Sequence, residues 1–294
     1  MNYQSQRRNF FRISSLGLAA GALGASAMSI LDSRRAAAQA NPKSLLRTVL
    51  DRGHVLVGTG STNTPWHFED EAGKLVGMDI AMARILAKGL FDDESKVKFV
   101  LQDPAQRIPN IVAGKVDIVI QFMTVTPQRA QLVAFTRPYF AESMALLSNT
   151  DGSKNTFQAL LAGEAGTKVS VLQNVDAETL VRKVLPKAQV LQLDTLVNVI
   201  QALDSRRVDA AAVNLSAVRW MVKRTPNRYA DAGKSWYTML YAAAVRQSDP
   251  DWLDFVNTAF NVAMRGHQND IYDGALNEYF GLEAPPRQPG FPSL

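Results

Sequence analysis

The sequence of 294 residues contains no cysteine. Disulfide bonds and thiolate metal sites are therefore excluded, and so is the lipid-bearing cysteine of a lipoprotein. Histidine is also scarce: His54, His67 and His267 lie far apart in the chain, without the spacing of a metal site. We expect neither a metal ion nor a cofactor.

Motifs for nucleotide binding and for nucleophilic catalysis are missing as well. The stretch Gly-Thr-Gly at residues 58–60 begins like a dinucleotide-binding loop, but Asn63 stands where the third glycine is required. No Gly-x-Ser-x-Gly elbow is present, and a Cys-His nucleophile is impossible without cysteine. These motifs therefore give no indication of an enzyme.

The excess of positive charge is confined to the first forty residues. The formal net charge is +5, but residues 1–40 contain five arginines and one aspartate, which leaves about +1 for the rest. A basic patch for nucleic acid is therefore not indicated. With 47% hydrophobic residues, a chain of this length can bury one large core or two medium ones.

The same forty residues have the order of a secretory signal. The pair Arg7-Arg8 precedes an apolar stretch at residues 13–31 that is rich in alanine and glycine, and Ala-Gln-Ala at residues 38–40 is a small-x-small cleavage site. The string Arg-Arg-x-Phe-Phe-Arg resembles a twin-arginine leader. A membrane anchor is the alternative, but the stretch is a poor match to about 20 strongly apolar residues. We expect a cleaved signal peptide at residues 1–40 and a periplasmic protein.

Predicted strands and helices alternate along the rest of the chain. Strands are predicted at residues 54–58, 97–101, 116–120, 169–172, 190–193, 208–213 and 240–245. Helices are predicted at residues 78–90, 109–113, 177–185, 195–203, 250–264 and 271–279. This alternation predicts an α/β protein of two lobes, each with a mostly parallel sheet flanked by helices.

Several short motifs occur in the order and spacing of a known family. They are Gly-Met-Asp-Ile at residues 77–80, Gly-Lys-Val-Asp at 114–117, Met-Thr-Val-Thr-Pro-Gln-Arg-Ala at 123–130, Phe-Thr-Arg-Pro-Tyr at 135–139, Arg-Val-Asp-Ala at 207–210 and Glu-Tyr-Phe-Gly at 278–281. Together they resemble family 3 of the bacterial extracellular solute-binding proteins, the polar amino-acid type. The resemblance covers nearly all of the chain after residue 50.

The resemblance implies a two-lobed periplasmic-binding-protein (Venus flytrap) fold with two hinge crossings. Lobe one would comprise residues 41–143 plus 244–294, and lobe two residues 144–243. A small carboxylate-bearing ligand, an amino acid or a compound like one, would bind between the lobes and close them. The closed form would dock on a cognate ABC permease in the inner membrane, and a monomer is expected.

The resemblance also places Arg129 where family members hold the ligand carboxylate. A guanidinium and a carboxylate form a charge-assisted pair of defined geometry. Thr124 would donate to the same oxygens. The alternative is a surface arginine near a helix end.

Three further residues of lobe one are candidate ligand contacts. Trp66 stands where the family has an aromatic residue, which would pack on an aliphatic stem or face a cation; a core tryptophan is the alternative. Asn63, on the same loop, would reach the ligand unless it only shapes a turn. Phe122 stands where the family commonly has glycine or a small polar residue. Its ring would narrow the cleft, stack on the ligand or turn into the sheet.

Lobe two departs from the family pattern at two places. Asn174 and Val175 replace a Gly-Thr or Gly-Ser pair at a helix N-terminus whose N–H groups would bind an anion, although Asp176 could cap those groups instead. Asn214 replaces the aspartate that pairs with the ligand's α-ammonium. An amide cannot neutralise a buried ammonium, whose unpaired burial is costly. We therefore expect a carboxylate other than an ordinary α-amino acid, unless Glu142 or an aromatic surface takes the place of the missing charge.

An exported enzyme on the same fold, of the cyclohexadienyl or arogenate dehydratase type, is the alternative function. Such chemistry requires a proton donor with a tuned pKa beside the ligand. Asn214 removes the acid from a central position, so the binding role is favoured.

Overall fold

The computed structural model describes residues 44–173, 177–268, 270–284 and 286–287. The predicted signal peptide at residues 1–40 and the candidate residues Asn174 and Val175 lie outside these ranges. In the described part of the chain, no helix combines the length and the apolar character of a membrane span.

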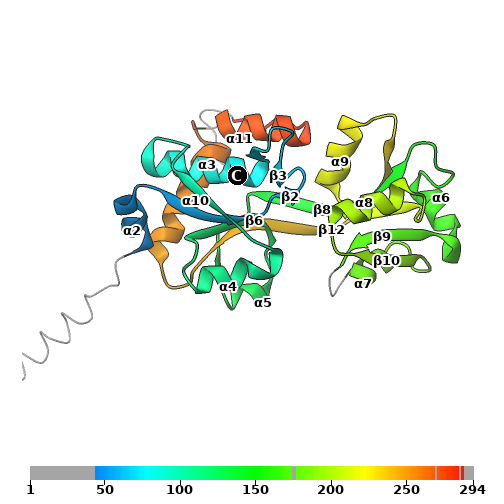
Figure 1. The fold of residues 1–294 in the computed structure, drawn as a ribbon, viewed down its shortest axis with the longest axis horizontal. Coiled ribbons are helices and arrows are strands. Elements are labelled where there is room, and N and C mark those ends of the chain that lie inside the picture. The colour runs from blue at the N-terminus through cyan, green and yellow to red at the C-terminus, as the bar shows by residue number, and fades with distance from the viewer. Residues whose placement is uncertain (1–43, 174–176, 269, 285, 288–294) are drawn as a thin grey trace, which may run out of the picture. The chain divides into compact units, whose positions relative to one another are not determined.

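Nine strands form one mixed sheet, whose main path runs in the order β10-β9-β11-β8-β12-β6-β1-β5 (Figure 1). The strands are β1 (Val55–Thr59), β5 (Val97–Leu101), β6 (Ile118–Thr124), β7 (Ala134–Phe135), β8 (Phe140–Asn149), β9 (Lys168–Leu172), β10 (Gln189–Leu193), β11 (Ala210–Asn214) and β12 (Tyr229–Val245). The outer pairs are parallel, whereas β8 and β12 are antiparallel to each other and to their neighbours β11 and β6. A small antiparallel sheet contains β2 (Thr62–Asn63), β3 (His67–Glu69) and β4 (Leu75–Val76).

Helices cover both faces of the large sheet. They are α2 (Leu45–Arg52), α3 (Met78–Phe91), α4 (Arg107–Val112), α5 (Pro127–Ala130), α6 (Phe157–Ala162), α7 (Ala177–Arg182), α8 (Leu196–Asp204), α9 (Leu215–Arg224), α10 (Pro250–Arg265) and α11 (Asp270–Ala275), followed by the π-helical turn η3 (Leu276–Phe280). Figure 1 shows α3 and α11 on one side of the sheet and α4 and α5 on the other. Helix α8 illustrates the local rules: the hydroxyl of Thr195 accepts the N–H of Asn198 as a cap, and Val199 and Leu203 bury one face.

The buried apolar side chains form separate clusters toward the two ends of the sheet. One cluster surrounds β1, α3 and α10 and includes Met82 and Trp252. Two others surround β9 and β11 and include Val169 and Leu203. Met239 of β12 packs against clusters of both ends. Strands β8 and β12 run from one end to the other, and the pairing of β12 with β8 is irregular between residues 231 and 239.

The predicted α/β class and the mostly parallel outer strands are confirmed, while the predicted lobe boundaries stay a prediction. Strand β6 begins at Ile118 and continues to Thr124 instead of spanning 116–120, and α4 begins at Arg107 instead of residue 109. Strand β12 is far longer than the predicted 240–245. Strand β8 was not predicted, because its alanine, leucine and methionine residues favour helices and only the pairing with β11 and β12 makes it a strand.

Candidate functional site

The short helix α5 places Arg129 beside the end of β6. The hydroxyl of Thr126 accepts the N–H of Arg129 at 3.2 Å, and Pro127 occupies the first helical position. The Nη1 atom of Arg129 donates to the carbonyl oxygen of Thr124 at 2.8 Å. Both residues are half-buried. Since no other described residue bonds to this guanidinium, its remaining N–H groups are available to a carboxylate.

Asp79 is a buried anchor behind this site. Its Oδ2 atom accepts the N–H of Phe122 at 2.9 Å and the Nδ1–H of His67 at 2.8 Å, and its Oδ1 atom accepts the hydroxyl of Tyr139 at 2.7 Å. Burial, together with the charge of Asp79, raises the pKa of Tyr139 well above its ordinary value. Tyr139 therefore keeps its proton as a donor at neutral pH, and Asp79 is fully occupied by the protein itself.

Phe122 has a left-handed backbone, with a φ of 34°. This conformation costs an ordinary residue about 1–2 kcal/mol, and here the hydrogen bond to Asp79 holds it. The ring of Phe122 stacks on the imidazole of His67, with centroids 4.8 Å apart and planes at 8°. Nε2 of His67 lies 3.2 Å from Nδ2 of Asn63. The candidates Phe122 and Asn63 are thus joined through His67, a residue that sequence reasoning set aside.

Arg107 is a buried residue of this region that was not among the candidates from the sequence. Its side chain lies over the ring of Phe122, with Cζ 4.8 Å from the centroid. It is only 6% exposed, and its Nε and Nη2 atoms are buried without a partner in the described structure. Burial and, next, the charge of Arg129 lower its pKa to about 10. The sequence contains no clear signal for it, because the predicted helix begins at residue 109 and the burial of Arg107 becomes visible only in the folded chain.

Trp66 is placed as a core residue, which is the alternative that the sequence left open. It is 1% exposed, and its ring packs edge-on against Phe140 and Tyr241, with centroids 4.9 and 5.1 Å apart. Its Nε1–H donates to the hydroxyl of Ser216 at 3.0 Å. A contact between Trp66 and a ligand stays a prediction.

Asn214 ends β11 and donates from Nδ2 to the hydroxyl of Tyr241 at 3.0 Å. Near it, Ser216 forms a short hydrogen bond to Oε2 of Glu142. Glu142 is 1% exposed, and its Oε1 atom accepts the N–H of Ser143 at 2.8 Å. Burial is the main cause that raises the pKa of Glu142, against the opposing effect of these hydrogen bonds. The carboxyl group beside Asn214 is therefore one that holds its proton more tightly than usual.

Contacts through Tyr241 and His67 join most of the candidates. Tyr241 pairs with Thr124 between β12 and β6, and its ring lies 5.7 Å from that of Phe122. The described candidates brought together in this way are Arg129, Thr124, Phe122, Asn63, Trp66 and Asn214. Two guanidinium groups, Arg107 and Arg129, and one carboxyl of raised pKa give the region the character of an anion site. Among described residues, no group of three or more His, Asp or Glu side chains is placed to hold a metal ion.

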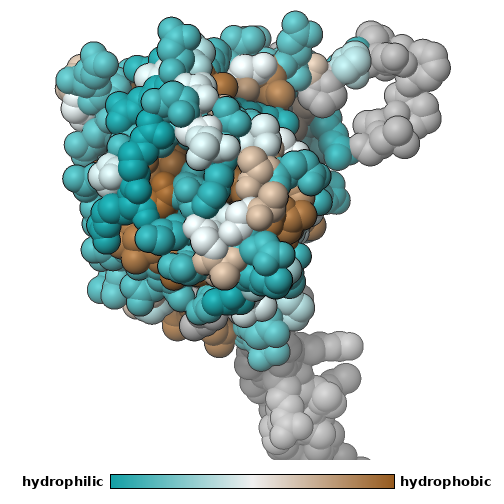
Figure 2. Space-filling model, turned by 90° about the vertical axis from the view of Figure 1, so that its right-hand side faces the viewer, coloured by the Kyte–Doolittle hydropathy of each residue, from teal (hydrophilic) through white to brown (hydrophobic). Residues whose placement is uncertain are grey.

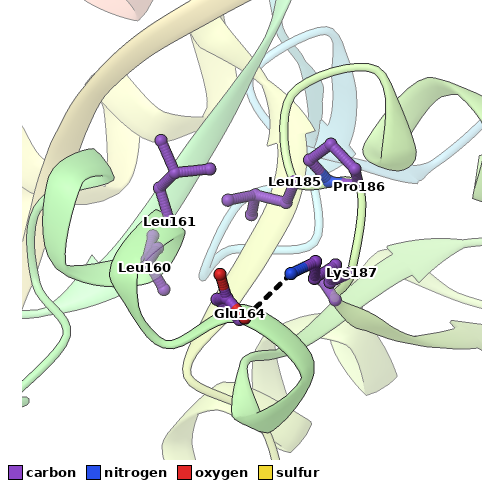
Figure 3. Close-up of a pocket in the computed structure, with 7 residues that line it drawn as sticks. Leu160, Leu161, Glu164, Leu185, Pro186 and Lys187 are labelled. Atoms are coloured by element: carbon purple, nitrogen blue, oxygen red, sulfur yellow. Dashed lines mark hydrogen bonds and ion pairs between the residues drawn. The ribbon is translucent and has the colours of Figure 1, made fainter.

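A separate pocket of about 180 Å³ lies away from these residues (Figure 3). Its lining is mainly apolar, with Leu160, Leu161 and Leu185, and its charges, Glu164 and Lys187, pair with each other at 2.9 Å. No free charge remains to bind a carboxylate. Figure 2 shows the face at the right-hand side of Figure 1, which is mainly hydrophilic with small separate apolar groups.

Comparisons with known proteins agree with the motifs. A model of the family described as bacterial extracellular solute-binding proteins, family 3, matches residues 55–281. A glutamine-binding protein of Geobacillus stearothermophilus is 30% identical over 62% of this chain and 69% of that protein. An L-cystine-binding protein of Escherichia coli (strain K12) is 29% identical over 73% of this chain and 79% of that protein.

Solved structures show the same likeness. The crystal structure of an ancestral amino acid-binding protein, described as a precursor of cyclohexadienyl dehydratase, matches with a TM-score of 0.68 and 28% identity. The match covers 81% of this chain and 100% of that one. A cysteine-binding protein from Campylobacter jejuni matches with a TM-score of 0.66 and 26% identity, over 80% of this chain and 92% of that one.

Proposed function

The chain belongs to family 3 of the bacterial extracellular solute-binding proteins, and we propose that it is the periplasmic binding component of an ABC importer. It captures a small carboxylate-bearing polar solute, an amino acid or a compound like one, and delivers it to a permease in the inner membrane. A cleaved twin-arginine signal at residues 1–40 and a monomeric state complete the proposal. The relatives named above are, by their names, binding proteins for glutamine, cystine and cysteine.

The observation that carries this proposal is the guanidinium of Arg129. Only one of its N–H groups is bonded within the described structure, to the carbonyl of Thr124. That bond orients the planar guanidinium group, and its remaining N–H groups are available to two carboxylate oxygens. A surface arginine that merely supported α5 would not need to be half-buried next to a second arginine.

The proposed mechanism is closure of two lobes, residues 41–143 plus 244–294 and residues 144–243, around the solute. Strands β8 and β12 contain the two crossings. The pairing of β12 with β6 shifts register between Ala242 and Ala244, which supports a hinge at the second crossing. Two hydrogen bonds already join residues of the proposed lobes: Trp66 to Ser216, and Ser216 to Glu142. A solute that contacts both lobes favours the closed form by its differential affinity.

The solute lacks a free α-ammonium group in this proposal. The amide of Asn214 is neutral, and its Nδ2 is already bonded to Tyr241. Both oxygens of Glu142 accept hydrogen bonds from Ser143 or Ser216, and its raised pKa weakens it as a counter-ion. Tight, selective binding of an unmodified L-amino acid in calorimetry would reject this part of the proposal and leave the importer role intact.

The importer role is tested by a thermal-shift screen of amino acids, betaines, opines and organic acids, followed by calorimetry on the compounds that stabilise the protein. Arg129→Ala is expected to weaken binding by at least about 30-fold, since truncating one partner of a buried charge pair costs about 2 kcal/mol or more. Arg137→Ala is the matched control, because Arg137 is exposed in the same part of the chain. Equal affinity for the wild type and Arg129→Ala contradicts the proposal.

An exported dehydratase is a second candidate function, and one observation favours it. Glu142 is a buried carboxyl of raised pKa beside the site, which suits a proton donor. Incubation with prephenate or arogenate separates the two functions. If the protein is a dehydratase, it converts these compounds, and Glu142→Gln loses that activity. If it is a binding protein, prephenate and arogenate stay unchanged.

A further inference from the structure

Arg107 is a buried cation that forms no ion pair within the described part of the chain. The described structure contains five ion pairs that involve other arginines: Arg52 with Asp117, Arg182 with Glu178, Arg206 with Asp151, Arg228 with Asp204 and Arg287 with Asp273. All five of these arginine side chains are more exposed than Arg107, at 23% or more. Arg107 is 6% exposed and has no ion pair with any described residue. Asp79 is the buried carboxylate nearby, but its two oxygens are occupied by His67, Phe122 and Tyr139.

Leaving a buried guanidinium unpaired is costly for the folded protein. A buried donor without a partner loses its hydration, and a buried unpaired charge loses more. Two of the four buried unpartnered side-chain atoms in the described structure, Nε and Nη2, belong to Arg107. Its head group lies over the face of the Phe122 ring. Phe122 itself keeps a strained left-handed backbone at this position, and such strain is typical of binding sites.

The two arginines of the site are neighbours of equal sign. The charge of Arg129 disfavours the charged form of Arg107, and the charge of Asp79 opposes this effect only in part. Arg107 lies over Phe122, and Arg129 is bonded to Thr124. Phe122 and Thr124 are two residues apart on β6, which corresponds to roughly 7 Å along a strand. One monovalent carboxylate would neutralise only one of the two charges. Two acid groups on a short carbon chain would neutralise both.

We propose that Arg107 is a second anion-binding arginine of the ligand site, and that the solute is a small diacid with one acid group on Arg129 and the other on Arg107. This inference rests on the proposed function and narrows its ligand class. The proposed function excludes a free α-ammonium group on the solute, and the arms of the experiment test that part separately.

The experiment compares diacids with their monoamides by calorimetry, because each pair differs in one charge and hardly in size. The pairs with an α-amino group are L-aspartate with L-asparagine and L-glutamate with L-glutamine. The pairs without one are succinate with succinamate and glutarate with glutaramate. In the wild type, at least one diacid is expected to bind about 30-fold or more tightly than its monoamide.

The arginine variants assign that preference to Arg107. In Arg107→Met the ratio of the diacid and monoamide affinities is expected to fall close to one, and Arg107→Lys should restore part of it because the charge is kept. Three results overturn the inference: no diacid binds at millimolar concentration, the monoamides bind as tightly as the diacids, or Arg107→Met leaves the ratio unchanged.

A measurement without ligand keeps the test independent of the compounds chosen. Because Arg107→Met removes an unpaired buried charge and keeps an apolar stem of similar length, the Tm of the ligand-free protein should rise by about 2–4 °C or more. Arg52→Met is the matched control and should lower the Tm, since it leaves the buried carboxylate of Asp117 without its cation. A structural arginine at position 107 would also lower the Tm on substitution, and that result counts against the inference.

Failure of the inference differs from failure of the proposed function. If the monoamides bind and their affinity depends on Arg129 but not on Arg107, the protein is a solute-binding protein for a monoacid. If no binding in any arm depends on Arg129, the proposed function itself falls.

Discussion

The hydrogen bond from Tyr139 to Asp79 gives a quantitative test of how the site is held. The substitution Tyr139→Phe removes one oxygen atom and keeps the ring in a fully buried place. The bond is 2.7 Å long, and its acceptor is a carboxylate that no solvent reaches. Asp79 would keep the other two of its three donors, His67 and Phe122.

The magnitude follows from the charge of the acceptor. A hydrogen bond to a charged group contributes about 1.5–3 kcal/mol to stability. For a domain of this size, 1 kcal/mol corresponds to a Tm change of roughly 2–4 °C. Tyr139→Phe should therefore lower the free energy of unfolding by about 1.5–3 kcal/mol and the Tm by about 3–12 °C.

Urea denaturation of the ligand-free protein measures this free energy, and an unchanged m-value shows that only stability has changed. Tyr272→Phe is the matched control, because the hydroxyl of Tyr272 reaches only the carbonyl of Tyr139, at 3.5 Å, the limit of a hydrogen bond. We expect it to cost less than about 1 kcal/mol. Equal losses in the two variants, or no loss in Tyr139→Phe, would refute the role given to Asp79.

Two further predictions concern the backbone beside the site and the carboxyl of Glu142. Gly77 has a φ of 120°, and a Cβ atom there would lie 2.4 Å from the carbonyl oxygen of Trp66, so Gly77→Ala should cost at least about 3 kcal/mol in urea denaturation. Gly73→Ala, at a φ of 74° with open space around it, should cost only about 1 kcal/mol, and a similar loss at both positions would contradict the steric argument. The pKa of Glu142 in the folded state lies above its ordinary value of 4.5. The stability that its bound proton contributes is therefore fully present below about pH 4.5 and is lost as the pH rises through the raised pKa. Glu142→Gln lacks this loss, and its Tm relative to the wild type should increase from acid to neutral pH; a relative decrease would show that ionised Glu142 is stabilised by the fold.

Local signals in the sequence were sufficient for most outer strands and helices. The predicted strand at 97–101 coincides with β5, and the helices at 78–90, 195–203 and 250–264 agree with α3, α8 and α10 to within one residue. These segments have apolar residues at regular spacing and capping residues at their ends, such as Asp249 before α10. Strands β8 and most of β12 could not be predicted, because their pairing depends on residues far away in the chain.

Residues of the site could be predicted only where they belong to a sequence motif. The motif at residues 123–130 led to Arg129 and Thr124, which the structure joins by a hydrogen bond. Asp79 reads in the sequence as an ordinary acidic residue in the first turn of a helix, and its three donors come from β3, β6 and the segment before β8. Arg107 could not be ranked as a ligand contact, since neither burial nor the lack of a counter-ion is visible before the chain is folded.

A crystal structure of the protein with its bound solute tests the role of Arg129 without intermediate assumptions. We expect an acid group of the solute on the guanidinium of Arg129, held by two N–H groups at about 2.7–2.9 Å. A solute whose acid group is bound elsewhere, with Arg129 turned toward solvent, would contradict this role.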